Sequence, residues 1–575
     1  MKFLLVGINA KYIHSNPAIR SLYAYVGTEH QKKVELAEYT INNRQEEILA
    51  DLYERRPDVI GFSCYIWNFG MVKSLLFDLA AIMPETKIWL GGPEVSFDGL
   101  KLLAEFPMIE GIMTGEGEVT FKELLEYYEN AQKDLSEIKG LILRSGHTPC
   151  REALSLDEVP FLYEDLSEFE NRIIYYESSR GCPFRCSYCL SSVAGPVRFR
   201  SIDLVKKELQ FFLDRKVPQV KFIDRTFNCN KEHALAIWRY IKENDNGVTN
   251  FHFEIAADIL SPEEIELLAT LRPGLVQLEI GVQSTNEKTL AAINRPAKTE
   301  RIKEIVGQIL QPGNVHIHLD LIAGLPYEDY ESFSRSFQEV FAMGPHQLQL
   351  GFLKVLKGSP MEEMAAEHGI LYQKEPPYEV LTTGLLSYEE IRNLKQIEEM
   401  VEIYHNSSQF RYTLPVLLAE YANPFDFFDE LATYYKDRGY RINTPARGSR
   451  YDILLDFACM KNPEKEDLYR ELLTFDFYLR EKAKSRPAFA SSGEFMRDEI
   501  WAFYCKEEQE PEYLTEYETY HARQLMKMTH MEGFRYAVWE GISGKVRKLP
   551  EPALVLFDYK NRNLLTADAK FWITE

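Results

Sequence analysis

Short runs of apolar residues alternate with stretches of helical spacing over the first 145 residues. The continuous apolar runs predict buried strands at 3–8, 58–63, 87–90 and 109–113. Residues 71–83 carry apolar side chains at helical spacing between two of these strands. Alternating buried strands and helices are typical of a parallel sheet that binds ligands at the carboxyl ends of its strands. We therefore predict a doubly wound, Rossmann-like α/β domain over residues 1–145, followed by a linker over 146–171.

The same alternation continues from residue 172 to residue 375. Strands are predicted at a run beginning with Ile173 and at 220–223, 251–255, 276–280, 316–322 and 347–352. Stretches such as 204–213 and 330–341 have helical spacing. Repeated strand–helix units favour a (β/α) barrel or a partial barrel, whose active site is built at the carboxyl ends of the strands.

Residues 376–575 predict a mixed α/β C-terminal cap. Helices are expected at 388–404 and 464–480, and strands at 534–539, 553–557 and 569–573. Dense aromatic segments such as 425–428 and 475–478 are interpreted as core, and no chemical motif stands out. We expect this region to cover the active site and to recognise the substrate.

Composition and charge narrow the class of protein. A chain of 575 residues with 45% hydrophobic residues suggests about three to four domains with substantial cores. The net charge of −22, without a Lys/Arg-rich run, argues against a nucleic-acid partner. No run of eighteen apolar residues occurs, so we expect a cytoplasmic protein without a membrane anchor. The 8 cysteines are too few for a disulfide scaffold in a chain of this length.

Three cysteines, Cys182, Cys186 and Cys189, follow the strand that begins at Ile173. Three thiolates can ligate three irons of a [4Fe-4S] cluster, and because no fourth cysteine is nearby, one iron would stay open to a ligand. A partial zinc site with a distant fourth ligand and a chance group of buried thiols are the alternatives, although structural zinc ligands usually come as Cys-x-x-Cys pairs. The other cysteines are scattered singly. The spacing therefore favours an iron–sulfur cluster.

Unusual residues follow the strands of the N-terminal domain. They are residues 9–17 with His14, then Ser63 and Tyr65, then Gly91 and Gly92, and then Gly115 and Glu116. Glycines at such positions permit a ligand to approach the backbone closely, although each pair taken alone could simply form a turn. Their serial order favours a binding site.

Polar residues also end the predicted barrel strands. They are Asp224, Glu254, Glu279 with Gln283, and the segment from Asp320 to Gly324. Such a ring is typical of a barrel active site, although any one carboxylate could instead pair with an arginine such as Arg225. Arg198 and Arg200 could neutralise a carboxylate or phosphate of a ligand, or could form salt bridges within the barrel.

The cysteine motif resembles the signature of the radical S-adenosylmethionine (SAM) enzymes, Cys-x-x-x-Cys-x-aromatic-Cys, with Tyr188 at the aromatic position. The resemblance implies that SAM chelates the open iron and is cleaved to a 5′-deoxyadenosyl radical, with Tyr188 near the adenine. It places Asp224 at the family's Gly-Gly-Glu element, without the glycines. It also implies SAM contacts at Glu279, Gln283, Ile322 and Gly324, and we add Glu254 at the neighbouring strand end.

The N-terminal series resembles the cobalamin-binding domains, with their pattern Asp-x-His-x-x-Gly, then Ser-x-Leu, then Gly-Gly. Ser63, Tyr65, Gly91 and Gly92 match the later elements, and Gly115 and Glu116 follow. The first element keeps His14 but has Tyr12 in place of Asp and Pro17 in place of Gly. In the family the Asp orients the histidine that ligates cobalt. His14 is therefore left with three roles: cobalt ligand, another cofactor contact, or loop cap.

Over residues 1–375 the chain resembles cobalamin-dependent radical SAM enzymes, which implies a [4Fe-4S] cluster, SAM and cobalamin as cofactors. The function we predict is methylation of an unactivated carbon of a small-molecule substrate, with an external low-potential electron donor. Two alternatives stay open. One is a cyclisation, rearrangement or oxidation without net methyl transfer, and the other is a non-enzymatic cobalamin sensor with a structural cluster. The acidic balance argues against RNA modification.

Overall fold

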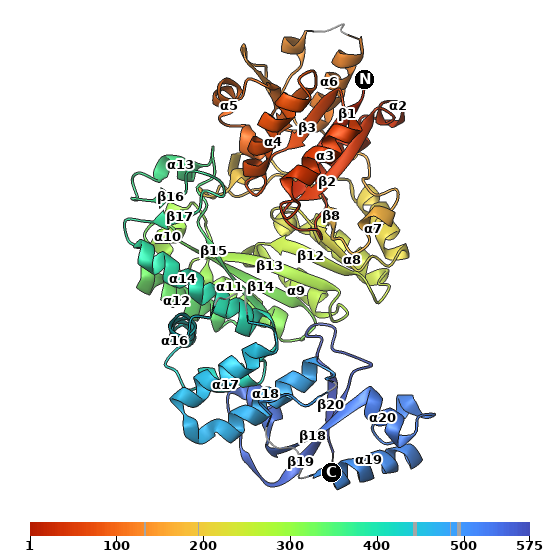
Figure 1. Cartoon of the computed structure of the whole chain (residues 1–575), viewed down its shortest axis with the longest axis vertical. Helices are drawn as coiled ribbons and strands as arrows, with labels where there is room; N and C mark the ends of the chain where they lie inside the picture. The colour runs from red at the N-terminus through yellow and green to blue at the C-terminus, as the bar shows by residue number, and fades with distance from the viewer. Residues whose placement is uncertain (131–133, 194, 441–444, 484, 491–495, 575) are drawn as a thin grey trace.

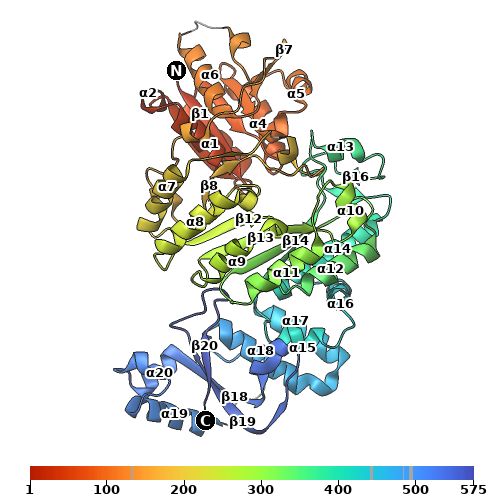
Figure 2. The ribbon, with the colours of Figure 1, turned by 180° about the vertical axis from the view of Figure 1, so that it is seen from behind.

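The structure, a computed structural model, describes residues 1–130, 134–193, 195–440, 445–483, 485–490 and 496–574. An N-terminal α/β domain lies at one end of the molecule, a barrel-like domain in the middle, and the C-terminal region at the other end (Figures 1 and 2). Within these ranges no helix has both the length and the apolar character that a membrane span requires.

The N-terminal domain is built on a seven-stranded sheet in the order β2-β1-β3-β4-β5-β6-β7. Strands β1 to β5 are parallel, and β6 and β7 extend the sheet in antiparallel pairing. The parallel part has the flavodoxin-like order 2-1-3-4-5. The strands are β1 (Phe3–Asn9), β2 (Val34–Thr40), β3 (Val59–Ser63), β4 (Lys87–Gly91), β5 (Ile109–Met113), β6 (Leu141–Leu143) and β7 (Gly146–His147).

Helices cover both faces of this sheet. One hydrophobic core joins the sheet to α3, α4 and α5, and a second core joins it to α1 and α6. The predicted strands of this domain are found within a residue or two of their expected ends, but strand β2 was not predicted. The helices are α1 (Pro17–Tyr25), α2 (Thr28–Gln31), α3 (Gln45–Arg55), α4 (Phe69–Ile82), α5 (Gly99–Glu105) and α6 (Gly117–Asn130).

The middle domain is an open sheet of six parallel strands in the order β15-β14-β13-β12-β11-β8. All six predicted strands are present. They are β8 (Ile174–Tyr176), β11 (Gln219–Phe222), β12 (Asn250–Ile255), β13 (Val276–Gln283), β14 (His316–Ala323) and β15 (Gln347–Phe352). The helices that follow the strands are α7 (Ile202–Asp214), α8 (Lys231–Glu243), α9 (Pro262–Ala269), α10 (Glu287–Ala292), α11 (Thr299–Leu310) and α12 (Tyr330–Phe341).

Side chains alternate along the barrel strands between the helix layer and the interior. In β13, for example, Val276, Leu278, Ile280 and Val282 are buried, and Gln277, Glu279, Gly281 and Gln283 between them are partly exposed. The buried set packs with the outer helices in one large core. The interior face of this half-open barrel is therefore polar, because the strands alternate with period two.

A short segment after β15 returns toward the N-terminal domain. It holds α13 (Pro360–Met364) and the antiparallel pair β16 (Leu371–Tyr372) and β17 (Val380–Thr382). Lys357 Nζ lies 2.9 Å from Asp98 Oδ2, and Lys73 Nζ lies 2.5 Å from Glu375 Oε2. These ion pairs join the segment to the N-terminal domain.

The C-terminal region combines helices with a three-stranded antiparallel sheet in the order β18-β19-β20. Its elements are α14 (Tyr388–Val401), a π-helical turn (Glu402–Asn406), α15 (Thr413–Leu418), α16 (Pro424–Asp437), α17 (Ser449–Lys461), α18 (Glu466–Arg480), α19 (Arg497–Gln509), α20 (Ala522–Met528), β18 (Thr529–Tyr536), β19 (Lys548–Asp558) and β20 (Lys570–Thr574).

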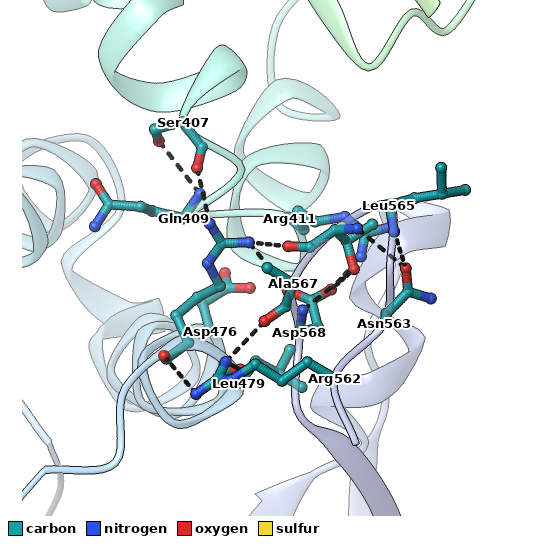
Figure 3. Close-up of polar contacts among 12 residues, drawn as sticks. Ser407, Gln409, Arg411, Asp476, Leu479, Arg562, Asn563, Leu565, Ala567 and Asp568 are labelled. Carbon is teal, nitrogen blue, oxygen red and sulfur yellow. Dashed lines mark hydrogen bonds and ion pairs between the residues drawn. The ribbon is translucent and has the colours of Figure 1, made fainter. Parts of the chain in front are cut away.

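A polar network ties the helices of this region to the loop before β20 (Figure 3). Asp568 is ion-paired with Arg411, and Arg562 Nη1 donates to the carbonyl of Ala567 at 2.7 Å. Asp476 of α18 accepts hydrogen bonds from the backbone N–H groups of Tyr412 and Thr413 at 3.0 and 2.8 Å. The helical part and the sheet are thus held together as one unit.

Two expectations for the C-terminal region were wrong. The strand expected at 534–539 ends at Tyr536, because Glu471 accepts the N–H groups of Arg535 and Tyr536, and a 3₁₀ helix (Val538–Ser543) follows. The region also does not cover the cavity described below, since α14 and α16 lie beside the barrel and the elements from α17 to β20 lie at the end of the molecule away from the N-terminal domain (Figure 1).

Candidate functional site

A cavity of about 910 Å³ lies between the N-terminal domain and the carboxyl ends of the barrel strands. Its lining includes every residue that the sequence predicted for cobalamin: His14, Ser63, Tyr65, Gly91, Gly92, Gly115 and Glu116. Glu254 and Gly181, which precedes the first motif cysteine, line it from the barrel side. The cavity therefore brings together the strand ends of both domains.

The loops after β3 and β4 form one wall of the cavity. A Cβ atom on Gly92, whose φ is +110°, would lie 2.5 Å from the backbone oxygen of Cys64, so only glycine fits there. Buried Asn68 holds the loop after β3, since it accepts from the N–H of Tyr65 at 2.8 Å and donates to the carbonyls of Ser63 and Ile8. The sequence analysis did not single out Asn68, whose partners lie at two separate strand ends.

Two aromatic rings extend this wall. Tyr65 and Trp67 are stacked with ring centroids 4.4 Å apart, and both line the cavity. Burial raises the pKa of Tyr65, so its hydroxyl stays protonated at neutral pH. The stack offers a flat apolar surface next to the Gly91–Gly92 backbone.

His14 lies where the two domains meet. Its Nδ1 is 2.5 Å from the hydroxyl of Tyr175 in barrel strand β8. Next to it, Asn16 caps helix α1 by accepting from the N–H of Ile19, and Pro17 takes the first helical position, which suits a proline. Burial and the charge of Lys11 lower the pKa of His14, so its imidazole is neutral. Tyr175 thus contacts the His14 ring, whereas the family pattern has an Asp two residues before the histidine to orient it.

Arg198 and Arg200 form ion pairs within the protein. Arg200 Nε donates to Glu208 at 2.8 Å and its Nη1 to the carbonyl of Val159 at 2.8 Å, and Arg198 is ion-paired with Glu116. Of the two roles left open for these arginines, internal salt bridges are therefore the one found. Val159 belongs to the predicted linker, and linker residues from Leu156 to Tyr163 line the cavity.

Arg180 links the N-terminal domain to the cysteine loop. Its guanidinium lies 3.0 Å from Glu118, 3.5 Å from Glu116 and 2.8 Å from Glu177. Burial alone would raise the pKa of Glu116, but Arg198 and Arg180 lower it below its usual value. Sequence reasoning missed Arg180, because Glu116 and Glu118 lie more than sixty residues before it in the chain.

The cysteine loop leaves the short strand β9 (Ser179–Arg180), which pairs with β10 (Arg198–Phe199). Gly181 has φ +105°, and a Cβ atom there would lie 2.9 Å from the carbonyl of Pro196. Cys186 is buried, and Cys182 and Cys189 are partly exposed. Within the described ranges no three Cys, His, Asp or Glu side chains converge on a single-ion site. A cubane cluster does not require that, since each thiolate binds a different iron.

Asp224, predicted as a SAM contact, is fully buried behind the cysteine loop. It accepts from the N–H of Ser178 at 3.0 Å, from the hydroxyl of Ser178 at 2.7 Å and from that of Ser179 at 2.6 Å. Burial raises its pKa to about 7. These contacts favour a role in holding β9, and a contact with SAM stays a prediction.

Charged and polar groups fill the barrel interior below the cavity. Glu279 lies 2.9 Å from His252 Nε2 and 3.2 Å from Lys221 Nζ. Burial alone would raise the pKa of Glu279, but His252 and Lys221 lower it to about 2. Burial and the charge of Glu279 raise the pKa of Asp320 well above its usual value. Glu279 is thus an anion, whereas burial and the negative charge of Glu279 disfavour the charged form of Asp320.

Three buried polar atoms near the upper ends of β13 and β14 lack a hydrogen-bond partner among the described residues: Gln283 Oε1, Asp320 Oδ1 and Arg295 Nε. Arg295 Nη1 also donates to Cys186 Sγ at 3.7 Å. Buried polar atoms without partners are costly, so such a group indicates a polar ligand. Arg295 was not predicted, since it lies on the loop after α10, far from any motif.

Tyr188 and Ile322 pack against one hydrophobic cluster, which includes Leu325, Leu353 and Val380. Gly324 lies two residues after Ile322, and a Cβ atom there would lie 2.8 Å from Val380 Cγ1. The structure therefore brings together Tyr188, which the resemblance places near the adenine of SAM, and Ile322 and Gly324, which it gives as SAM contacts. That contact itself stays a prediction.

The residues present fit all three cofactors. The large cavity with its glycine-lined wall suits cobalamin, the partnerless polar atoms beside the Tyr188 cluster suit SAM, and three thiols in one loop suit a [4Fe-4S] cluster. Cys182, Cys186 and Cys189 would hold the cluster. Gln283 and Arg295 would face SAM, and the loops after β1, β3, β4 and β5 would hold cobalamin.

Comparison with protein families assigns three segments. Residues 4–125 match the B12 binding domain, residues 176–340 match the radical SAM superfamily, and residues 366–557 match a protein family of unknown function, DUF4080.

Individual proteins give the same picture. The chain is 23% identical over 476 residues to 2-(S-pantetheinyl)-carbapenam-3-carboxylate methyltransferase of Streptantibioticus cattleyicolor. This alignment covers 76% of this chain and 68% of that protein. It is 24% identical over 425 residues to the cobalamin-dependent radical SAM methyltransferase TokK of Streptomyces tokunonensis. This alignment covers 66% of this chain and 62% of TokK.

Solved structures share the fold. The cobalamin-dependent radical SAM enzyme OxsB superposes with a TM-score of 0.58 at 15% identity, over 83% of this chain and 79% of OxsB. The methyltransferase TsrM from Kitasatospora setae, with cobalamin and a [4Fe-4S] cluster bound, superposes with a TM-score of 0.54 at 17% identity, over 66% of this chain and 82% of TsrM. The α/β fold class and the three predicted cofactors are confirmed, and this chain is a cobalamin-dependent radical SAM enzyme with a DUF4080 region at its C-terminal end.

Proposed function

We propose that this enzyme transfers a methyl group to an unactivated carbon of a small-molecule substrate. The observation that carries the proposal is the single cavity, which joins the predicted cobalamin residues to Glu254 and the cysteine loop. When bound, the cluster and SAM supply a 5′-deoxyadenosyl radical, and cobalamin supplies a methyl group. Relatives named as methyltransferases support the same choice.

The chain's own residues position the reactants. Arg180 fixes the cysteine loop against the loop after β5, and the Gly91–Gly92 backbone and the Tyr65 ring face the same space. Because these groups come from both domains, the cavity is formed only when the two domains dock.

A second candidate is radical chemistry without net methyl transfer. It is favoured by relatives named anaerobic magnesium-protoporphyrin IX monomethyl ester cyclase, including one of Synechocystis that is 24% identical over 332 residues. The contact of His14 with Tyr175, in place of the family's Asp, also leaves the cobalt ligand of this chain open.

The test is anaerobic incubation of the reconstituted protein with SAM, a low-potential reductant and candidate metabolites, followed by mass analysis. We expect a product that is one methyl group heavier, together with both S-adenosylhomocysteine and 5′-deoxyadenosine. Formation of 5′-deoxyadenosine with a changed substrate but without S-adenosylhomocysteine would instead establish the second candidate.

A further inference from the structure

The charged side chains that line the cavity are almost all neutralised by one another. Arg180 pairs with Glu116, Glu118 and Glu177, and Arg200 pairs with Glu208. Glu254 comes no closer than 4.0 Å to its nearest cation, Lys221.

Arg225 is the exception. It lines the cavity, its side chain is exposed, and within the part of the chain that the structure describes it has no ion pair and its guanidinium makes no hydrogen bond. A free guanidinium in a cavity whose other arginines are paired is available to a ligand.

Arg225 lies on the barrel side of the cavity. It follows the end of β11, and Glu254 lies near the end of the adjacent strand β12. Arg225 lines the cavity together with Glu254 of the barrel and Tyr65 of the N-terminal domain. Arg225 therefore lies between the barrel strand ends and the cobalamin wall.

The side chains of Arg225 and Glu254 together favour one class of ligand. A guanidinium presents a planar fork of N–H donors that matches a carboxylate in two parallel hydrogen bonds. One guanidinium balances a single negative charge, and the carboxylate of Glu254, which also lines the cavity, disfavours a dianion such as phosphate. Glu254, away from its nearest cation, accepts a hydrogen bond from a donor group.

We propose that Arg225 and Glu254 bind the substrate, which is a small molecule carrying a carboxylate next to an ammonium or hydroxyl group. Arg225 holds the carboxylate and Glu254 accepts from the neighbouring donor. The inference rests on the proposed function for the identity of the cavity, and it adds the substrate class.

The test uses holoenzyme with cluster and cobalamin under anaerobic conditions. The probes are the twenty proteinogenic L-amino acids and their 2-hydroxy-acid analogues, each paired with its amide. Binding is measured by equilibrium dialysis, and 5′-deoxyadenosine formation is measured after addition of SAM and reductant. We expect at least one acid to bind and to raise 5′-deoxyadenosine formation, while its amide, which lacks the negative charge, does neither.

Substitutions test which side chains bind the acid. Arg225→Gln should raise the half-saturating concentration of that acid about 10- to 100-fold, the effect of losing a charge-assisted contact, and Arg225→Lys should raise it less. Glu254→Gln should weaken binding of the amino acid more than that of its hydroxy analogue. Arg215→Gln is the matched control, because Arg215 is exposed at the end of α7 and does not line the cavity.

Three results would overturn the proposal: no acid binds the wild type, acid and amide bind equally, or Arg225→Gln lowers the affinity for SAM or cobalamin instead. A wild type that forms no 5′-deoxyadenosine with any probe would refute the proposed function. The dialysis measurement would still decide the substrate class in that case, so the two failures are distinguishable.

Discussion

Asp224 could act on SAM or could hold the cysteine loop in place. Its position in the sequence predicts a contact with SAM, whereas its contacts indicate that it holds β9 at the start of the cysteine loop. The two roles predict different outcomes for the same substitution. We expect Asp224→Ala to loosen the cluster and to leave the intrinsic affinity for SAM unchanged.

The magnitude follows from the three hydrogen bonds. Asp224→Ala leaves the buried N–H of Ser178 without a partner, which costs about 1–3 kcal/mol, while the two serine hydroxyls can turn toward other acceptors at a cost of about 0.5–1.5 kcal/mol each. The sum is about 4 kcal/mol, which corresponds to a shift of about 1,000-fold in the equilibrium between the ordered and the disordered loop. Asp224→Asn should be much milder, because its amide oxygen can accept from the backbone N–H while its NH₂ donates to the hydroxyls.

The assay is the iron content after anaerobic reconstitution, together with the rate at which a chelator removes the iron. We expect about four irons per chain in the wild type and in Asp224→Asn, and fewer irons with faster release in Asp224→Ala. Asp476→Ala is a matched control. Asp476 is also buried and accepts from two backbone N–H groups and the hydroxyl of Thr413, but it lies in the C-terminal region. It should lower thermal stability without changing the iron per folded chain.

One outcome would contradict the role of Asp224 in holding β9. If Asp224→Asn keeps four irons and the wild-type release rate but binds SAM more than tenfold more weakly, the carboxylate charge acts on SAM and the positioning role is wrong. Measurement of SAM affinity on cluster-loaded protein separates this result from simple loss of the cluster.

Four further outcomes are expected. Cys186→Ala should abolish SAM cleavage after reduction, and full cleavage by this variant would contradict the cluster assignment. His14→Ala should leave the visible spectrum of bound cobalamin almost unchanged if Tyr175 rather than cobalt is the partner of the ring, whereas a large spectral shift would show cobalt ligation. Gly92→Ala should weaken cobalamin binding at least tenfold, as measured by titration, because its Cβ would clash with a backbone oxygen of the loop after β3. Burial lowers the pKa of His316 to about 3 and that of His318 to about 4, so the unfolded chain binds protons on these residues first as pH falls. Thermal stability should therefore fall from about pH 6.5 toward pH 4 and should fall less in His318→Gln.

The sequence predicted the elements whose side chains are buried in a regular period. Strand β15 and helix α12 have the predicted ends, because each packs a full apolar face into the core. Strand β2 was missed since it is an edge strand in which only Val34 and Ala37 are buried, so its apolar pattern is weak.

The residues of the candidate site also include some that the sequence predicts and some that it does not. The cobalamin set gathered at one cavity because parallel strands bring their carboxyl ends to one edge, which a sequence pattern can predict. Arg180, Asn68 and Arg295 could not be predicted, since each acts through partners on other elements that only the folded chain brings near.

The position of the C-terminal region changes where substrate recognition is to be sought. Asn406 at its start pairs with both backbone groups of Leu348, at 2.9 and 3.0 Å, and so covers the open edge of the barrel at β15. The segment directly after β15 then reaches the N-terminal domain through Lys357 and Asp98, while Arg180 forms the corresponding link on the side of β8. Ionic contacts on the sides of both edge strands of the barrel, which also include Lys73–Glu375 and Arg198–Glu116, therefore join the barrel to the N-terminal domain on either side of the cavity. The family match begins at residue 366, so Glu375, which pairs with Lys73 of the N-terminal domain, belongs to the DUF4080 region. We therefore propose that this region helps to hold the two domains together and that the side chains that contact the substrate come from the barrel strand ends and the N-terminal loops.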